Sequence, residues 1–256
     1  MENKFLSADN INKHLTHSIR LEVLETVDST NLYLKRKNPA DLESGDTVIA
    51  LSQTAGRGRF TRKFHSPDGG LYMSCFLSPK ADLSEIPLIT SAAAAAVCET
   101  VESFGKNANI KWVNDIIMNK KKVCGILSEG VIADGKLLGV IVGIGINLYE
   151  PDGGFHDDIK EIAGAVFADK YEADFNLFTA QIINRLLGFS NNLSERAFLD
   201  YYRKKSLVLG KEITVISGES SEKATALAID DNCRLEVKYN DSSRKLLDSG
   251  EISIKL

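Results

Sequence analysis

The sequence predicts an α+β protein, with a mixed domain over residues 1–205 and a small all-β domain over residues 206–256. In the first part, an alanine-rich segment and an apolar segment with helical spacing alternate with strand-like runs, as expected for a sheet covered by helices. After Ser206 only short β segments separated by turns remain, which is typical of a small barrel.

The composition is that of a globular protein that lacks a general affinity for nucleic acid. Of the 256 residues 43% are hydrophobic, and 31 basic against 35 acidic residues give a net charge of −4. An anion site would therefore need a local concentration of cations. The four cysteines are far apart, and no apolar run approaches the length of a membrane span. We expect free thiols, a cytoplasmic location and no membrane contact.

Local patterns predict the elements of the first half in order. Pro87 suits the first turn of a helix, five alanines favour its continuation, and Gly105 can end it. Pro39 disfavours helix in the residue before it. The predicted elements are a helix over 5–15, a strand over 20–27, a helix over 31–38, strands over 46–54 and 70–78, and a helix over 85–105.

Three further strands are predicted over 109–115, 121–132 and 136–148, as a meander. The last of these is so uniformly apolar that we expect it at the centre of its sheet. Helices are predicted over 158–168, 174–190 and 195–205.

The stretch "QTAGRGRFTRKF", residues 53–64, is the first candidate site. Gly56 and Gly58 allow close backbone approach to a ligand, and Arg57 and Arg59 offer planar donor forks for phosphate or carboxylate. A solvated basic surface loop is the alternative interpretation. The glycine spacing does not match a Walker A loop, so an ordinary P-loop nucleotidase is disfavoured.

The second candidate is "KWVND", residues 111–115. On a continuous strand Lys111, Val113 and Asp115 would face one way, with Trp112 and Asn114 on the other side. Lys111 and Asp115 could then share a cleft. The alternative is an edge strand that carries a surface salt bridge.

Two more stretches could line a ligand-binding site. In "GVIVGIGINL" the glycines Gly143 and Gly145 indicate close packing against a ligand or a second backbone, and Asn147 ends the apolar run with an amide. In "DSTN", residues 28–31, three small polar side chains follow a strand and could bind a polar head group. Asp28 or Ser29 could equally cap the following helix.

Six motifs in one order resemble the biotin protein ligases. They are "DSTN", "QTAGRGR", "SPDGGLYMS", "KWVND", "KVCGILSE" and "GIGINL", and with the β domain the resemblance covers about residues 20–256. It implies a catalytic domain like that of class II aminoacyl-tRNA synthetases and an SH3-like C-terminal domain. It also implies an enzyme that uses ATP and Mg²⁺ to form biotinyl-5′-AMP. Biotin then passes to one lysine of a biotin carboxyl carrier protein of acetyl-CoA carboxylase or a related carboxylase.

The resemblance also assigns residues. The implied biotin site comprises Ser29, Thr30, Asn31, Gln53, Gly56, Gly58 and Gly125. Lys111 would contact the α-phosphate and the reacting carboxylate, while Arg57 and Arg59 belong to a loop that closes over biotin and phosphate. Trp112, Asn114 and Asn147 would hold the adenylate. Asp115 is our hypothesis for a group that orients Lys111 or the incoming amine, and no metal ligand is assigned.

Two positions depart from the family pattern. Thr61 stands where the loop usually has a third glycine, which leaves less backbone freedom for closure. Val113 stands where proline usually follows the tryptophan, and this change should be harmless. Only 27 residues precede "DSTN", so we expect no DNA-binding domain and no repressor function. The resemblance makes a homodimer through the central sheet plausible without excluding a monomer.

Two other functions stay open at this point. A lipoate–protein ligase would also form an acyl-adenylate on a related fold, although the "GRGR" loop and the β domain resemble the biotin enzymes. A non-enzymatic regulator would bind an adenylate or nucleotide without turning it over.

Overall fold

A computed structural model describes residues 6–60, 62–79, 85, 87–217, 220–248 and 250–254. Thr61, whose effect on loop closure was of interest, lies outside these residues. The helices are α1 Ala8–Asn12, α2 Thr30–Lys35, α3 Leu88–Ser103, α4 Phe175–Asn191 and α5 Leu199–Lys205, with 3-10 turns η1 Pro39–Asp41 and η3 Leu193–Glu195.

Over the described residues, the large sheet has seven strands in the order β1-β2-β3-β7-β6-β5-β4. The strands are β1 Leu21–Val27, β2 Thr47–Gln53, β3 Gly70–Leu77, β4 Asn109–Lys111, β5 Asp115–Met118, β6 Lys121–Ala133 and β7 Lys136–Asn147. The β1–β2 pair is parallel, with α2 as its crossover, and the other neighbouring pairs are antiparallel. The apolar strand β7 lies in the middle, which confirms its predicted central place.

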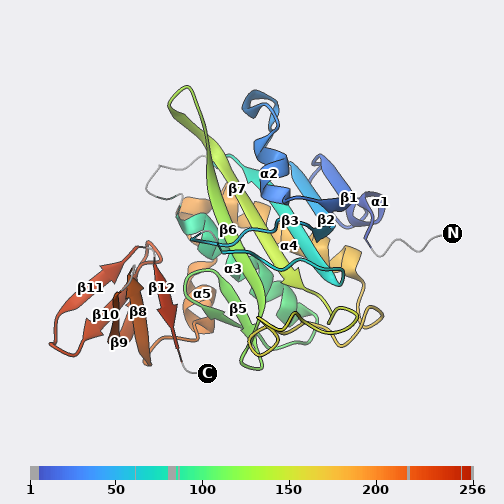
Figure 1. Ribbon diagram of the computed structural model, residues 1–256. Coiled ribbons are helices and arrows are strands. Elements are labelled where there is room, and N and C mark those ends of the chain that lie inside the picture. Colours follow the sequence, from blue (N-terminus) through green and yellow to red (C-terminus); the bar gives the residue numbers. More distant parts are fainter. Residues whose placement is uncertain are drawn as a thin grey trace.

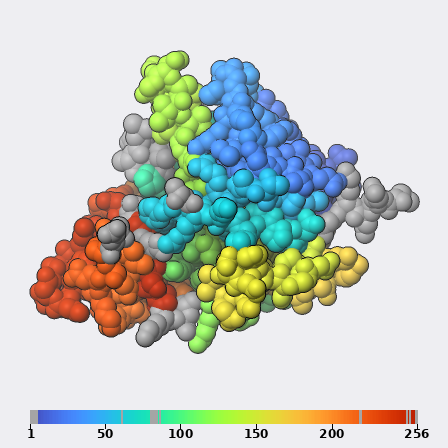
Figure 2. Space-filling model, viewed as in Figure 1, coloured from blue at the N-terminus to red at the C-terminus, as the bar shows by residue number. Residues whose placement is uncertain are grey.

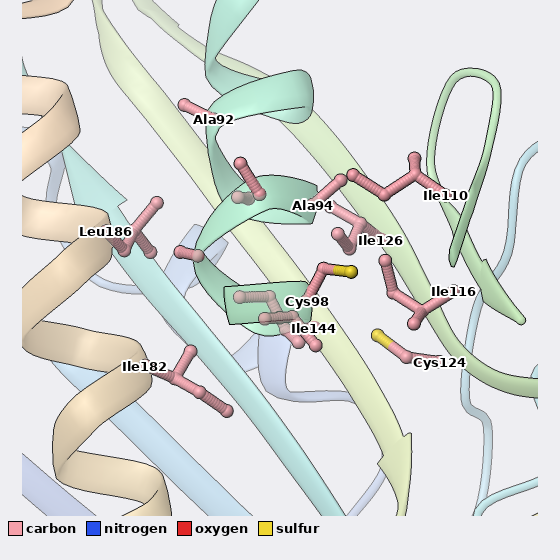
Figure 3. Close-up of a cluster of buried hydrophobic side chains, with 14 of the residues drawn as sticks. Ala92, Ala94, Cys98, Ile110, Ile116, Cys124, Ile126, Ile144, Ile182 and Leu186 are labelled. Atoms are coloured by element: carbon pink, nitrogen blue, oxygen red, sulfur yellow. The ribbon is translucent and has the colours of Figure 1, made fainter. Parts of the chain in front are cut away.

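The two faces of the large sheet have different partners. On β7, Val140, Val142, Ile144 and Ile146 point to the face covered by α3 and α4. Figure 1 shows these helices behind the sheet, and Figure 3 shows alanines of α3 packed beside Ile126 and Ile144. Small alanine side chains let α3 approach closely, and each fully buried isoleucine contributes about 1.5–3 kcal/mol. The opposite face carries α2 and the candidate site.

The long helices are confirmed, with α4 starting one residue after the cap Asp174, whose carboxylate accepts from the backbone N–H of Asn176 and Leu177. The helix predicted over 158–168 is wrong. Its backbone groups bond to the sheet instead: Lys122 N–H donates to Ile162 O at 2.7 Å, and Val166 N–H donates to Asn147 O at 3.0 Å. These bonds to strands outweigh the weak helical pattern, since a short isolated helix is marginal.

The predicted strand over 109–115 is also corrected. Residues 112–114 form a turn, and β4 and β5 on either side pair as a hairpin in which Lys111 stands opposite Asp115. The Trp112–Val113 peptide is cis. The predicted three-strand meander therefore contains four strands.

The C-terminal part forms a separate antiparallel sheet in the order β11-β10-β9-β8-β12. Its strands are β8 Glu212–Ser217, β9 Ser220–Ile229, β10 Leu235–Tyr239, β11 Arg244–Leu247 and β12 Glu251–Ser253. Trp112 Nε1 donates to Cys233 O at 2.9 Å, which ties this sheet to the β4–β5 hairpin. The domain boundary near residue 205 stays a prediction. Among the described residues, no helix has the length and apolar character needed to cross a membrane.

Candidate active site

A cavity of about 180 Å³ lies on the face of the large sheet opposite α3 and α4. Most of the predicted site residues line it. These are Ser29, Thr30, Asn31, Gln53, Arg57, Gly58, Arg59, Lys111, Trp112, Asn114, Asp115 and Gly125. The lining residues come from the part of the chain between Ser29 and Gly145 and, through Gly250 and Ile252, from the C-terminal part.

The floor of the cavity is made of glycines from adjacent strands. Gly145 pairs in register with Gly125 on one side and with Tyr72 on the other. A Cβ on Gly145 would lie 2.6 Å from the ring of Phe64, and one on Gly143 would lie 2.2 Å from Asn31 Oδ1. Close packing at these glycines was predicted against a ligand or a second backbone, and the groups that use the space here are the side chains of Phe64 and Asn31.

The "DSTN" residues form the buried polar end of the cavity. Ser29, Thr30 and Asn31 are at most 4% exposed. The Asn31 side chain accepts from Ser74 Oγ at 2.6 Å and donates to Glu129 Oε2 at 2.8 Å. A side chain held at both ends in this way presents a fixed amide to a ligand.

Gln53 extends this polar end. Its Oε1 accepts from the Thr30 backbone N–H at 2.9 Å, and its Nε2 donates to Ser66 Oγ at 2.8 Å. The capping alternative finds no support at Ser29, whose side chain makes no cap hydrogen bond. Asp28 instead binds Arg36 at 2.6 and 2.9 Å, and this pair together with the Ser29 N–H lowers the pKa of Asp28 to about 2.

The Gly/Arg stretch is a folded hairpin, which we call the arm and define as residues 53–66. Antiparallel bridges join Gln53 to Ser66 and Arg57 to Lys63. A Cβ on Gly56 would lie 2.3 Å from the Phe64 carbonyl, so this glycine is required by the hairpin itself and does not line the cavity. Figure 1 shows the arm crossing in front of β6 and β7, and Figure 2 shows its cyan atoms covering that face.

Both predicted arginines of the arm contact protein acceptors. Arg57 Nη1 lies 3.2 Å from Glu129 Oε1, and Arg59 Nη1 donates to Asn114 Oδ1 at 2.8 Å. Arg59 Nη2 also donates to the carbonyl of Gly250 in the C-terminal sheet. Arg59 thereby links the arm, the β4–β5 hairpin and the second sheet.

The β4–β5 hairpin supplies the remaining polar groups. Lys111 and Asp115 are register partners, and Asp115 Oδ1 lies 2.6 Å from Lys122 Nζ. Asn114 Nδ2 donates to Ile126 O at 2.7 Å, which fixes the turn to β6. Lys111 and Asp115 thus meet as predicted, although across a hairpin and not along one strand.

Sequence reasoning placed Asn147 in the site and missed several other groups. Asn147 does not line the cavity, and its Nδ2 donates to Gly164 O at 2.9 Å. Phe64, Tyr72 and Lys122 line the cavity without having been predicted, as do Gly250 and Ile252. The pair Gly143 and Gly145 in β7 indicated that a group packs closely on the sheet, and this group is the Phe64 ring at Gly145. No pattern in the neighbouring sequence indicated that Gly250 and Ile252 would line the cavity.

Glu129 is a further residue that the sequence analysis did not single out. Its carboxylate receives Lys35 Nζ at 2.6 Å in addition to Asn31 and Arg57. Burial acts to raise the pKa of Glu129, but hydrogen bonds from Lys35 and Asn31 outweigh it and hold that pKa below its ordinary value. Glu129 is therefore an ionised centre that connects the arm to the buried polar end.

Two family models match the chain. The biotin/lipoate A/B protein ligase family matches residues 23–147, and the biotin protein ligase C-terminal domain matches residues 208–255. The bifunctional ligase/repressor BirA of Bacillus subtilis is 32% identical over 243 residues, which cover 90% of this chain and 72% of that protein. BirA of Escherichia coli is 35% identical over 128 residues, and that alignment covers 49% of this chain and 40% of the relative.

Solved structures agree with these matches. Biotin protein ligase from Aquifex aeolicus, in complex with biotin and ATP, superposes with a TM-score of 0.70 at 30% identity, covering 91% of this chain and 97% of that one. These likenesses extend over both sheets, and the chain belongs to the biotin/lipoate A/B protein ligase family, among the biotin protein ligases.

Proposed function

We propose that this chain is an ATP-dependent biotin protein ligase. It forms biotinyl-5′-AMP from biotin and ATP and then transfers biotin to a lysine of a biotin carboxyl carrier protein. The observation that carries this proposal is the meeting of Arg57, Arg59 and Lys111 around the same cavity as the polar "DSTN" end.

The first half-reaction joins two anions. The biotin carboxylate attacks the α-phosphorus of ATP and pyrophosphate leaves, so charge repulsion is the main obstacle. Lys111 is suited to hold the reacting carboxylate beside the α-phosphate, and Arg59 lines the same cavity from the arm. Fixed cations around one cavity offset the charge that develops without a large reorganisation.

The buried polar end fits the ureido ring of biotin. A ureido group has one carbonyl acceptor and two N–H donors, and Ser29, Thr30 and Asn31 supply hydroxyls and an amide of both kinds. The glycine floor and the Phe64 ring offer an apolar slot for the rest of the bicycle. Exclusion of water by the arm would protect the mixed anhydride until the carrier lysine attacks its carbonyl.

Mg²⁺ is expected to enter with the triphosphate. Among the described residues that line the cavity, Asp115 is the one carboxylate. Mg²⁺ in phosphoryl-transfer sites is commonly held by one or two carboxylates together with the phosphates, so this donor set fits. When bound, the ion would neutralise phosphate charge.

The test is biotinylation of a carrier domain by the purified protein with ATP, Mg²⁺ and biotin, read by intact-mass spectrometry. We expect the addition of one biotinyl group, which is lost when the carrier lysine is changed to arginine. Labelled lipoate in place of biotin tests the related ligase activity. Modification by lipoate in preference to biotin, or binding without any transfer, would overturn the proposal.

A further inference from the structure

Two of the four histidines of the chain lie together outside the cavity. His65 is on the arm, directly after Phe64, and its ring stacks on that of His156 with centroids 5.1 Å apart. Asp158 Oδ2 lies 3.3 Å from His156 Nδ1. His156 and Asp158 are well exposed, with side-chain exposures of 60% and 75%.

The nitrogen and oxygen atoms of this cluster are arranged as ligands for a cation. Within the described part of the chain, His65, His156 and Asp158 are the group whose potential ligand atoms all lie within 4.8 Å of one another. His156 Nδ1 also accepts from the Asp158 backbone N–H at 3.3 Å, so its lone pair is directed toward the Asp158 side. His156 Nδ1 and Asp158 Oδ2 lie 3.3 Å apart, which is about the separation of two ligand atoms on one tetrahedral ion.

We propose that His65, His156 and Asp158 form a binding site for a zinc-type divalent metal ion. Two imidazoles and one carboxylate, with water as the fourth ligand, are a donor set that Zn²⁺ uses, and imidazole also suits Cu²⁺ and Ni²⁺. Tetrahedral coordination brings ligand atoms to about 3.3 Å from one another. The separations between ligand atoms therefore have to shorten by at most roughly 1.5 Å, which side chains at the surface can do by rotation.

The site joins the arm, which borders the cavity, to a segment that does not line it. His65 belongs to the arm, whose Phe64 ring covers Gly125 and Gly145. His156 and Asp158 belong to the segment 149–173, which Figure 2 shows in yellow beside the cyan arm. A bound ion would tether the arm to this segment, and the inference does not depend on the function proposed above.

The first experiment measures Zn²⁺ binding to the untagged, chelator-treated protein in competition with a chromophoric chelator. We expect one Zn²⁺ per chain and at least tenfold weaker binding in His65→Ala and in His156→Ala. His14→Ala, a change to an exposed histidine outside the cluster, is the matched control and should bind as wild type does. The four cysteines are buried and do not compete in the folded protein. Equal affinity in wild type and His65→Ala, or no binding to wild type, would overturn the site.

The second experiment tests the tether by limited trypsin digestion. The arm offers Arg57, Arg59, Arg62 and Lys63 as cleavage points. Zn²⁺ should slow cleavage of the arm several-fold in wild type and leave the rate in His65→Ala unchanged. Equal rates with and without Zn²⁺ in wild type would refute the tether even if the ion binds.

Discussion

Gly143→Ala tests whether Asn31 is the fixed amide of the site. A Cβ at this position would lie 2.2 Å from Asn31 Oδ1 and 2.9 Å from its Cγ, so the Asn31 side chain has to leave its place. It would lose its hydrogen bonds with Ser74 and Glu129. At about 1 kcal/mol for the bond with Ser74, and somewhat more for the bond with the charged Glu129 carboxylate, we expect a loss of about 2–3 kcal/mol in the free energy of unfolding.

The consequences can be measured on the purified protein. For a chain of this size, 1 kcal/mol corresponds to about 2–4 °C in Tm, so Gly143→Ala should unfold roughly 5–10 °C below wild type. If Asn31 binds the ureido ring, calorimetric titration should show about tenfold weaker biotin binding, which is about 1.4 kcal/mol. Gly145→Ala is the matched control on the same strand, because its Cβ meets the movable ring of Phe64 and should cost less stability.

A double-mutant cycle identifies the cause. In an Asn31→Ala background the clash is absent, so adding Gly143→Ala should cost little further stability. A full additive loss in that background would show that the alanine disturbs β7 itself. A wild-type Tm and biotin affinity for Gly143→Ala would refute the reasoning directly.

Three further changes test the charged groups. Lys111→Ala should nearly abolish biotin-dependent pyrophosphate release while leaving circular dichroism unchanged, and release at the wild-type rate would remove Lys111 from its proposed role. Arg59→Gly loses the contact with Gly250, so trapping assays should find more free biotinyl-adenylate than wild type releases; equal release would count against arm closure. Glu129→Gln should lower Tm by a few degrees at pH 7. Because the folded-state pKa of Glu129 is lowered, its contribution is present above pH 4.5 and lost below, so the two Tm curves should converge in acid; a constant difference would argue against this.

Strong local patterns were sufficient for much of the fold. The apolar run of β7 was placed at the centre of its sheet, and the helical spacing from Phe175 to Phe189 produced the buried face of α4. The Gly/Arg stretch was predicted to cover an anion site, and it lies over the cavity. In each case the pattern extends over enough residues for local preference and tertiary packing to agree.

The features that were not predicted correctly share one physical cause, which is contact between segments far apart in the sequence. The turn at 112–114 is held by Asn114 Nδ2 on Ile126 O and by Tyr202 OH on the Val113 carbonyl. In the segment 158–168, local turn bonds such as Ala163 N–H to Ile159 O stand beside bonds to Lys122 and Asn147 of the distant strands β6 and β7. Gly250 reaches the cavity only because the second sheet docks beside the hairpin. None of these contacts can be predicted from the local sequence around the residues that make them.

Arg57 and Arg59 of the arm differ in the contacts that each would give up on moving to a phosphate. Two of the contacts of Arg59 are with the neutral Asn114 amide and the neutral Gly250 carbonyl, and moving these donors to a phosphate oxygen would exchange neutral hydrogen bonds for charge-assisted ones. Arg57 is held by the Glu129 carboxylate, at 42% side-chain exposure, where a surface ion pair contributes about 0–1 kcal/mol. If Arg57 moved to a phosphate, Glu129 would keep its contacts with Lys35 and Asn31. The move would gain little free energy, because the phosphate would only replace the Glu129 carboxylate as the anionic partner of Arg57. Arg57 is therefore better placed to hold the arm against the sheet than to follow a ligand, whereas the Asn114 and Gly250 contacts of Arg59 can be exchanged for contacts with a phosphate.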